Sequence, residues 1–123
     1  MGKTLFKKVT FAYTFLIIII SLIPIPGNFP FPEFKLFEFD KLIHLSMYFA
    51  MSIMWIRLES YSNSSFPVKS LLFVLLIASL TEFLQGILPI DRYSDWADFI
   101  ANSSGILLGI VAYSLYISKN KQY

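Results

Sequence analysis

The 123-residue sequence contains no cysteine, and only 15% of its residues are charged. The absence of cysteine excludes disulfides, thiol nucleophiles and cysteine-based metal sites. Soluble domains carry about 25% charged residues, so this shortage of charge, with 56% hydrophobic residues, indicates a membrane protein. The ten Lys and Arg residues are scattered, with no basic stripe and no aromatic RNA-binding motif, so nucleic acid is not an expected partner.

Four apolar segments are separated by short polar connections, and each is near the roughly 20 residues that a spanning helix needs. They cover residues 9–25, 41–58, 68–88 and 95–117. The first resembles the apolar part of a signal peptide, but it is long and ends in PIPG rather than at a small-residue cleavage site, so we expect a retained helix. We predict an all-α, polytopic membrane protein, with residues 1–123 forming one domain that folds as a four-transmembrane-helix bundle.

The charges divide unequally between the two ends of this predicted bundle. The N-terminus, the 57–69 connection and the C-terminus share seven Lys or Arg residues and one Glu, a net charge of +6. The opposite end has three Lys or Arg residues and six Asp or Glu residues, a net charge of −3. Cytoplasmic loops carry the excess of Lys and Arg, so we predict a multi-pass protein of the cell membrane with both termini cytoplasmic.

Glu82 is an ionisable residue inside the third apolar segment, and Gln85 follows it one turn later. At about 1.5 Å rise per residue, Glu82 lies roughly 9 Å below the outer end of its helix. Inward-facing ionisable residues in a membrane are costly, rare and usually functional. We expect Glu82 to form one wall of a polar pocket that opens outward, on a buried stripe of small and polar residues: Ala78, Glu82, Gly86 and Pro89.

Two further polar faces lie at the same depth on the second and fourth segments. Their residues are spaced for one helix face: Asp40, His44 and Tyr48 on the second, and Asp95, Asp98 and Asn102 on the fourth. The fourth-segment face continues into Gly105 and Gly109, and this G-x-x-x-G spacing lets helices approach closely in lipid. We therefore expect the polar faces to be buried and to meet Glu82.

The ordered motifs DKLIHLSMYF (40–49) and TEFLQGILPIDRYSDWADFIANSSGILLG (81–109) resemble the VanZ-like family, which is named for a teicoplanin-resistance protein. The resemblance covers roughly residues 38–110, whereas the first helix is generic, and Trp96 and Ala97 stand where the family often has smaller aliphatic residues. It implies a small integral membrane protein of the cell envelope that acts in glycopeptide resistance or envelope-lipid handling. The matching positions are Asp40, Lys41, His44, Glu82, Gln85, Arg92, Ser94, Asp95, Asp98, Asn102 and Gly105.

His44, Glu82 and Asp98 are the candidate catalytic residues, because a histidine beside carboxylates suits general acid–base chemistry. The candidate substrate-binding residues surround them, and among these Arg92 can hold a phosphate or carboxylate in bidentate fashion. One histidine and no paired motif predict no metal site, and no cofactor is expected. The binding set is Asp40, Lys41, Gln85, Arg92, Ser94, Asp95 and Asn102.

Structural interpretations compete with these assignments. Asp40, Lys41 and Asp95 could serve only as helix caps or interfacial anchors. Glu82 and Asp98 could form a salt-bridge lock with Arg92 and Lys41 that fixes three helix ends. The segment GNFPFPEFKLFEF (27–39) is expected to be an interfacial aromatic anchor, in preference to a lid over the pocket mouth.

Three classes of function remain open. The first is a protein that binds amphipathic anionic envelope molecules, and we favour it because no complete catalytic frame is visible. The alternative is an intramembrane acid–base enzyme acting on a lipid-linked envelope substrate, and a transporter ranks last because the inner half of the bundle lacks charged residues. Expected partners are membrane lipid and a lipid-linked cell-wall precursor or a glycopeptide, with a homo-oligomer left open.

Overall fold

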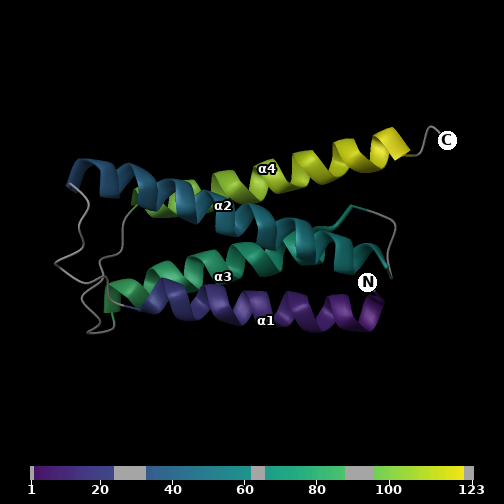
Figure 1. The fold of residues 1–123 in the computed structure, drawn as a ribbon, viewed down its shortest axis with the longest axis horizontal. Coiled ribbons are helices and arrows are strands. Elements are labelled where there is room, and N and C mark those ends of the chain that lie inside the picture. Colours follow the sequence, from purple (N-terminus) through teal and green to yellow (C-terminus); the bar gives the residue numbers. More distant parts are fainter. Residues whose placement is uncertain (1, 24–32, 62–65, 88–95, 121–123) are drawn as a thin grey trace.

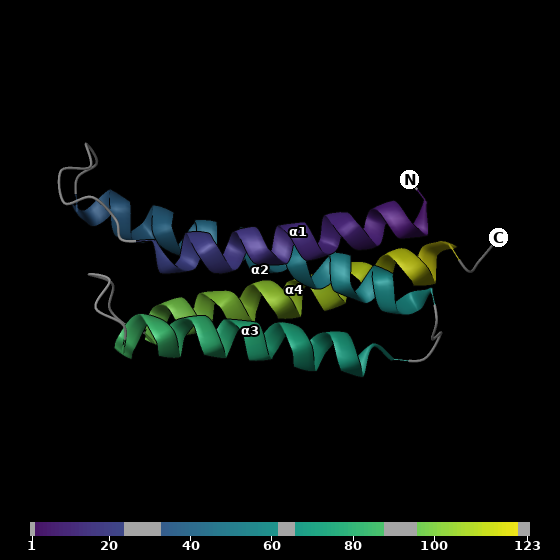
Figure 2. The same ribbon diagram turned by 90° about the horizontal axis from the view of Figure 1, so that it is seen from below.

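The computed structural model describes residues 2–23, 33–61, 66–87 and 96–120, and these form four α-helices. They are α1 (Lys3–Leu22), α2 (Glu33–Ser60), α3 (Val68–Ile87) and α4 (Trp96–Asn120). The helices run alternately up and down in one bundle, so that α1 begins and α4 ends at the same end (Figure 1). Helices α2 and α3 each contact all the others, and α1 and α4 lie on opposite sides of them (Figures 1 and 2).

Helices α1, α3 and α4 are long and apolar enough to cross a membrane. Large apolar side chains cover the outside of the bundle, and Phe15, Phe83 and Leu107 are each more than 60% exposed. A surface of this kind is stable against lipid and costly against water. Helix α2 contains the predicted span 41–58 and has 28 residues, but it is more polar than the other three. The predicted all-α fold of a membrane protein is therefore confirmed.

The helices extend beyond the predicted spans. Helix α1 begins at Lys3 and α4 continues to Asn120, because the polar residues that flank an apolar span can still be helical. Helix α2 begins at Glu33, so residues 33–39, which we expected to belong to an interfacial connection, are helical. Pro32 precedes this start, where proline is tolerated, and no proline or glycine interrupts the residues that follow. Residues 27–32 of the same connection lie outside the described residues.

The largest interface joins α2 to α4, and two glycines make it possible. A β-carbon added to Gly105 would collide with the backbone carbonyl oxygen of Leu45, and one added to Gly109 would collide with the Ser52 hydroxyl. The close approach predicted from the G-x-x-x-G spacing is therefore confirmed. On α3 the expected stripe is partly wrong, because Gly86 is exposed and Gln85 takes the buried position. Pro89 lies outside the described residues.

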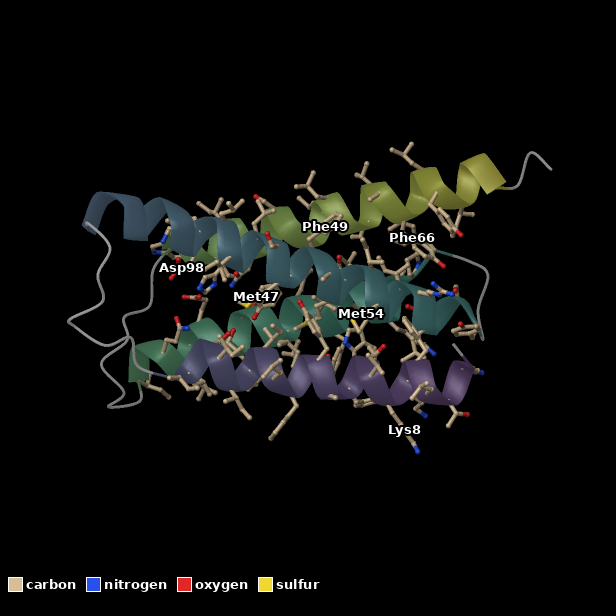
Figure 3. All side chains as sticks on the ribbon, in the orientation of Figure 1. Lys8, Met47, Phe49, Met54, Phe66 and Asp98 are labelled. Atoms are coloured by element: carbon tan, nitrogen blue, oxygen red, sulfur yellow. The ribbon has the colours of Figure 1, made fainter. Side chains whose placement is uncertain are left out.

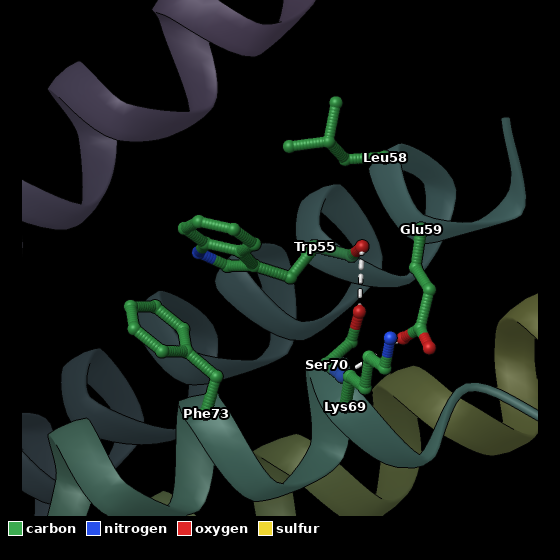
Figure 4. Close-up of a pocket in the computed structure, with 6 residues that line it drawn as sticks. All are labelled: Trp55, Leu58, Glu59, Lys69, Ser70 and Phe73. Atoms are coloured by element: carbon green, nitrogen blue, oxygen red, sulfur yellow. Dashed lines mark hydrogen bonds between the residues drawn. The ribbon is translucent and has the colours of Figure 1, made fainter. Parts of the chain in front are cut away.

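Polar contacts join α2 to its two neighbours in sequence. The Tyr13 hydroxyl donates to the Met47 carbonyl at 3.0 Å, and the Trp55 indole N–H donates to Thr14 Oγ1 at 2.9 Å, which fixes α1 against α2. At the start of α3 the Ser70 N–H donates to Glu59 Oε2 at 2.8 Å, and the Ser70 hydroxyl donates to the Trp55 carbonyl at 2.8 Å (Figure 4). A carboxylate from α2 therefore caps the first turn of α3.

Candidate functional site

Buried polar side chains from all four helices gather near the end of the bundle opposite the start of α1. Figure 3 labels Asp98 near this end and Lys8 near the other. All of these residues are at most 6% exposed, counting backbone and side chain together, except Lys41, which is intermediate. We call the set the polar cluster: Ser21 of α1; Lys41, His44 and Tyr48 of α2; Thr81, Glu82 and Gln85 of α3; and Asp98 and Asn102 of α4.

His44 and Asn102 make the central contact between α2 and α4. His44 Nδ1 lies 3.0 Å from Asn102 Oδ1, and both side chains are almost fully buried. An amide oxygen can only accept a hydrogen bond, so in this contact the imidazole donates from Nδ1 to Asn102. The contact fixes the orientation of the His44 ring between α2 and α4.

Lys41 and Asp98 form an ion pair between the same two helices. The distance between Lys41 Nζ and Asp98 Oδ1 is 2.5 Å, and the side chains are 19% and 9% exposed. Asp98 also lies in the first turn of α4, where a carboxylate is favoured by the helix dipole. The ion pair matches part of the salt-bridge lock that the sequence analysis gave as one alternative. Lys41 is its more exposed member.

Tyr48 lies at the base of the polar cluster and joins α2 to α3. Its hydroxyl is 3.0 Å from Thr81 Oγ1, and Thr81 is also 3.0 Å from the carbonyl oxygens of Ile77 and Ala78. Because the single Thr81 hydroxyl proton points to those carbonyls, Tyr48 is the donor in the contact with Thr81. Glu82 lies close enough to the Tyr48 hydroxyl to act on it electrostatically.

Two buried amide atoms of the cluster have no hydrogen-bond partner among the described residues: Gln85 Oε1 and Asn102 Nδ2. The other amide atoms of these two side chains are used, since Gln85 Nε2 donates to the Ser21 carbonyl at 2.6 Å and Asn102 Oδ1 contacts His44. A buried polar group without a partner costs about 1–3 kcal/mol. These two atoms therefore offer an acceptor and a donor to water or to a bound molecule.

The structure brings six of the predicted site residues into this cluster: Lys41, His44, Glu82, Gln85, Asp98 and Asn102. Arg92, Ser94 and Asp95 lie outside the described residues, and Asp40 belongs to α2 with a side chain that is not described. The catalytic and binding roles of all ten residues stay predictions. Among the described residues, no group of three His, Asp or Glu side chains could hold a metal ion.

Ser21, Tyr48 and Thr81 are members of the polar cluster that the predicted site set did not contain. The signal for Ser21 is present in the sequence, because Thr10, Thr14, Ile17 and Ser21 form the buried face of α1. Small and polar residues at this spacing indicate a helix face that meets other helices in a membrane.

Two cavities lie at the basic end of the bundle, away from the polar cluster. One, of about 370 Å³, lies between α2 and α3 and is lined by Trp55, Leu58, Glu59, Lys69, Ser70 and Phe73 (Figure 4). The other is a groove of about 520 Å³ between α2 and α4. Neither is lined by Glu82, so the outward pocket that we expected there stays a prediction.

Comparison with known proteins places almost the whole chain in one family. The family model VanZ/LLP1 matches residues 4–117, which include α1 and extend the resemblance beyond residues 38–110. No curated protein and no solved structure matches the chain.

Proposed function

Because this chain belongs to the VanZ/LLP1 family, we propose that it acts in the cell envelope by binding the polar end of an amphipathic anionic molecule in the polar cluster. In this proposal all four helices cross the cell membrane, both termini are cytoplasmic, and the polar cluster faces outward. The ligand class is a lipid-linked cell-wall precursor or a glycopeptide, as the link between the family's name and teicoplanin resistance suggests.

The observation that carries the proposal is the pair of buried amide atoms without hydrogen-bond partners among the described residues. Gln85 Oε1 and Asn102 Nδ2 come from α3 and α4, and the other amide atom of each side chain is held in place by a polar contact. Such preorganised groups support binding, because little side-chain freedom is lost when a ligand arrives. A headgroup rich in hydroxyls and amides would supply the missing partners.

Lys41 supports the choice of an anionic headgroup. It is the more exposed member of its ion pair with Asp98, so an incoming phosphate or carboxylate can reach the ammonium group without entering the bundle. Lysine holds phosphate as a compact positive charge. The acyl or prenyl part of the same molecule would remain in the lipid beside the exposed apolar side chains of α3 and α4, such as Phe83 and Leu107.

The alternative function, an intramembrane acid–base enzyme, is favoured by one observation. His44 is buried, and its contact with Asn102 fixes the orientation of its ring. A histidine held in one orientation is suited to exchange a proton with a bound substrate. Glu82 and Asp98 would then be the carboxylates that stabilise the charged imidazole.

The binding proposal is tested with a polyprenyl phosphate as the probe, added to the purified full chain in detergent. We expect it to raise the melting temperature, and we expect the corresponding polyprenyl alcohol to have a weaker effect. Asn102→Ala should raise the dissociation constant for the polyprenyl phosphate at least about tenfold and so reduce the rise in melting temperature. The reason is that a hydrogen bond to a charged group contributes about 1.5–3 kcal/mol. The matched control is Ser103→Ala on the adjacent residue of α4, which should respond like the wild type.

A second measurement separates the binder from the enzyme. Susceptible cells expressing the protein are challenged with teicoplanin, with Glu82→Gln and His44→Ala as variants. A binder should keep part of its protection in each variant, whereas an enzyme should lose all of it.

For the first measurement, equal responses of Asn102→Ala and Ser103→Ala to the polyprenyl phosphate would contradict the binding proposal.

A further inference from the structure

A second candidate site lies at the basic end of the bundle, in the groove between α2 and α4. Ile53 and Ala112 provide apolar lining, Arg57 provides a cation, and the remaining lining residues carry hydroxyls. The volume of about 520 Å³ is in the range of small-molecule sites. The groove lining is Ile53, Arg57, Ser60, Tyr61, Ala112, Tyr113 and Tyr116.

Aromatic rings hold two cations at this end of the molecule. The Arg57 guanidinium lies 5.2 Å from the centre of the Phe6 ring, and Lys3 Nζ lies 5.7 Å from the centre of the Tyr61 ring. The two rings contact each other edge to face at 6.4 Å. Cation–π contacts position a positive charge without neutralising it, so both cations keep their full charge for a ligand.

No carboxylate among the described residues pairs with Arg57 or Lys3. Glu59, which is near Arg57 in sequence, instead accepts the hydrogen bond from the Ser70 N–H at the start of α3. The Tyr113 hydroxyl donates to Ser60 Oγ at 3.0 Å across the groove, and the Ser60 hydroxyl donates to the Arg57 carbonyl oxygen at 2.6 Å. The end of the groove is therefore positive and rich in hydrogen-bonding groups.

The outer side of the groove continues into an exposed, mainly apolar surface of α4. Val111, Leu115 and Tyr116 of α4 are each more than half exposed. From Tyr116 toward Val111, this surface runs toward the middle of α4, which is long enough to span a membrane. Tyrosines are enriched where such helices meet the membrane interface. A positive, hydroxyl-lined end joined to an apolar side matches a molecule with an anionic head and long acyl chains.

We propose that this groove binds one anionic phospholipid, with its phosphate at Arg57 and Lys3, its glycerol region beside Ser60 and Tyr113, and an acyl chain along Ala112 and the exposed face of α4. The site is independent of the polar cluster, which lies at the opposite end of the bundle. The lipid would therefore link α1 to α4, two helices that make no contact with each other among the described residues.

The test uses the full chain in neutral detergent with phosphatidylglycerol, compared with phosphatidylcholine carrying the same acyl chains. We expect native mass spectrometry to show one retained phosphatidylglycerol and much less retained phosphatidylcholine. Arg57→Gln should weaken retention about fivefold, the factor contributed by one cation near an anionic lipid. Arg57→Lys should restore most of it, and Asn102→Ala in the polar cluster should leave it unchanged.

Lys8→Gln is the matched control, because Lys8 is an exposed cation at the same end that does not line the groove (Figure 3). Equal losses in Lys8→Gln and Arg57→Gln would show diffuse charge attraction and would overturn the proposal. Equal retention of the two lipids would also overturn it. Soluble glycerol phosphate, added at the same concentration as the lipid, should not displace phosphatidylglycerol. Full displacement would show that the groove binds an anion without its acyl chains, and would overturn the proposal of a lipid site. Melting curves without lipid confirm that each variant is folded.

Discussion

At the scale of single residues, Glu82 is a carboxylate buried inside the bundle. It is 6% exposed, on a helix that is apolar enough to cross a membrane. Burying a carboxylate is costly, and such residues in membrane helices face the bundle interior. Glu82 lies on the buried face of α3 and acts electrostatically on the Tyr48 hydroxyl of α2, so it faces the bundle interior.

We predict that Glu82→Gln keeps the melting temperature near or above the wild-type value and removes the envelope phenotype. The substitution retains the side chain's shape and removes a charge whose burial is costly, and functional sites often lower stability. A thermal melt in detergent and a complementation assay on the same variant measure the two effects. Glu59→Gln, at the basic end, is the control and should keep the phenotype. A joint fall of melting temperature and phenotype in Glu82→Gln would mean that Glu82 is architectural.

The Lys41–Asp98 ion pair gives a prediction of the opposite kind. Lys41→Met leaves Asp98 without its cation inside the bundle, and breaking a buried pair costs about 3–5 kcal/mol. Lys41→Met combined with Asp98→Asn should cost less than Lys41→Met alone, because the double variant leaves no charge uncompensated. The free energies of unfolding of both single variants and the double variant measure the coupling. Additive losses would show that the pair contributes no coupling.

At the scale of the helices, Gly105 and Gly109 are not equivalent. A β-carbon at Gly105 meets the Leu45 carbonyl, which belongs to a rigid helix backbone, whereas at Gly109 it first meets the Ser52 hydroxyl, which can rotate away. We predict that Gly105→Ala lowers the free energy of unfolding by about 1–3 kcal/mol, the usual cost of overpacking, and that Gly109→Ala lowers it less. Gly86→Ala, on an exposed part of α3, should be neutral or stabilising. The reverse order for Gly105 and Gly109 would contradict this description of the interface.

The helices were predictable from the sequence because length and hydropathy decide whether a segment can span a membrane. The start of α2 was not, because the aromatic residues of 33–39 suit an interface and a helix equally well. For the candidate site, the spacing of His44 and Asn102 placed both on inward faces. The contacts of Gln85 with Ser21 and of Tyr48 with Thr81 depend on how each helix is rotated about its axis relative to its neighbours. The spacing of polar residues along a single helix does not determine that rotation.

At the scale of the whole molecule, the charge distribution predicts how the bundle sits in the membrane. Lys3, Lys7, Arg57 and Lys69 belong to the end where α1 begins, and Asp98 to the other. Because the chain has no cysteine, single cysteines can be labelled without background. We predict that a membrane-impermeant thiol reagent added to intact cells labels Asp91→Cys and does not label Lys7→Cys or Lys121→Cys. Labelling of Lys121→Cys from outside would reverse the proposed orientation.

The hydrogen bonds of Ser70 to Glu59 and Trp55 also bear on biosynthesis. They join the end of α2 to the start of α3, so these two helices can enter the bilayer as a closed hairpin while the rest of the chain is still being translated. Helix α4 follows α3 along the chain, docks along Gly105 and Gly109, and brings Asp98 to Lys41 and Asn102 to His44. Until α4 has docked, the polar side chains of α2 lack these α4 contacts, and a polar group without a partner is costly in lipid. The contacts between α2 and α4 in the polar cluster are therefore formed only after α2 and α3 are in place.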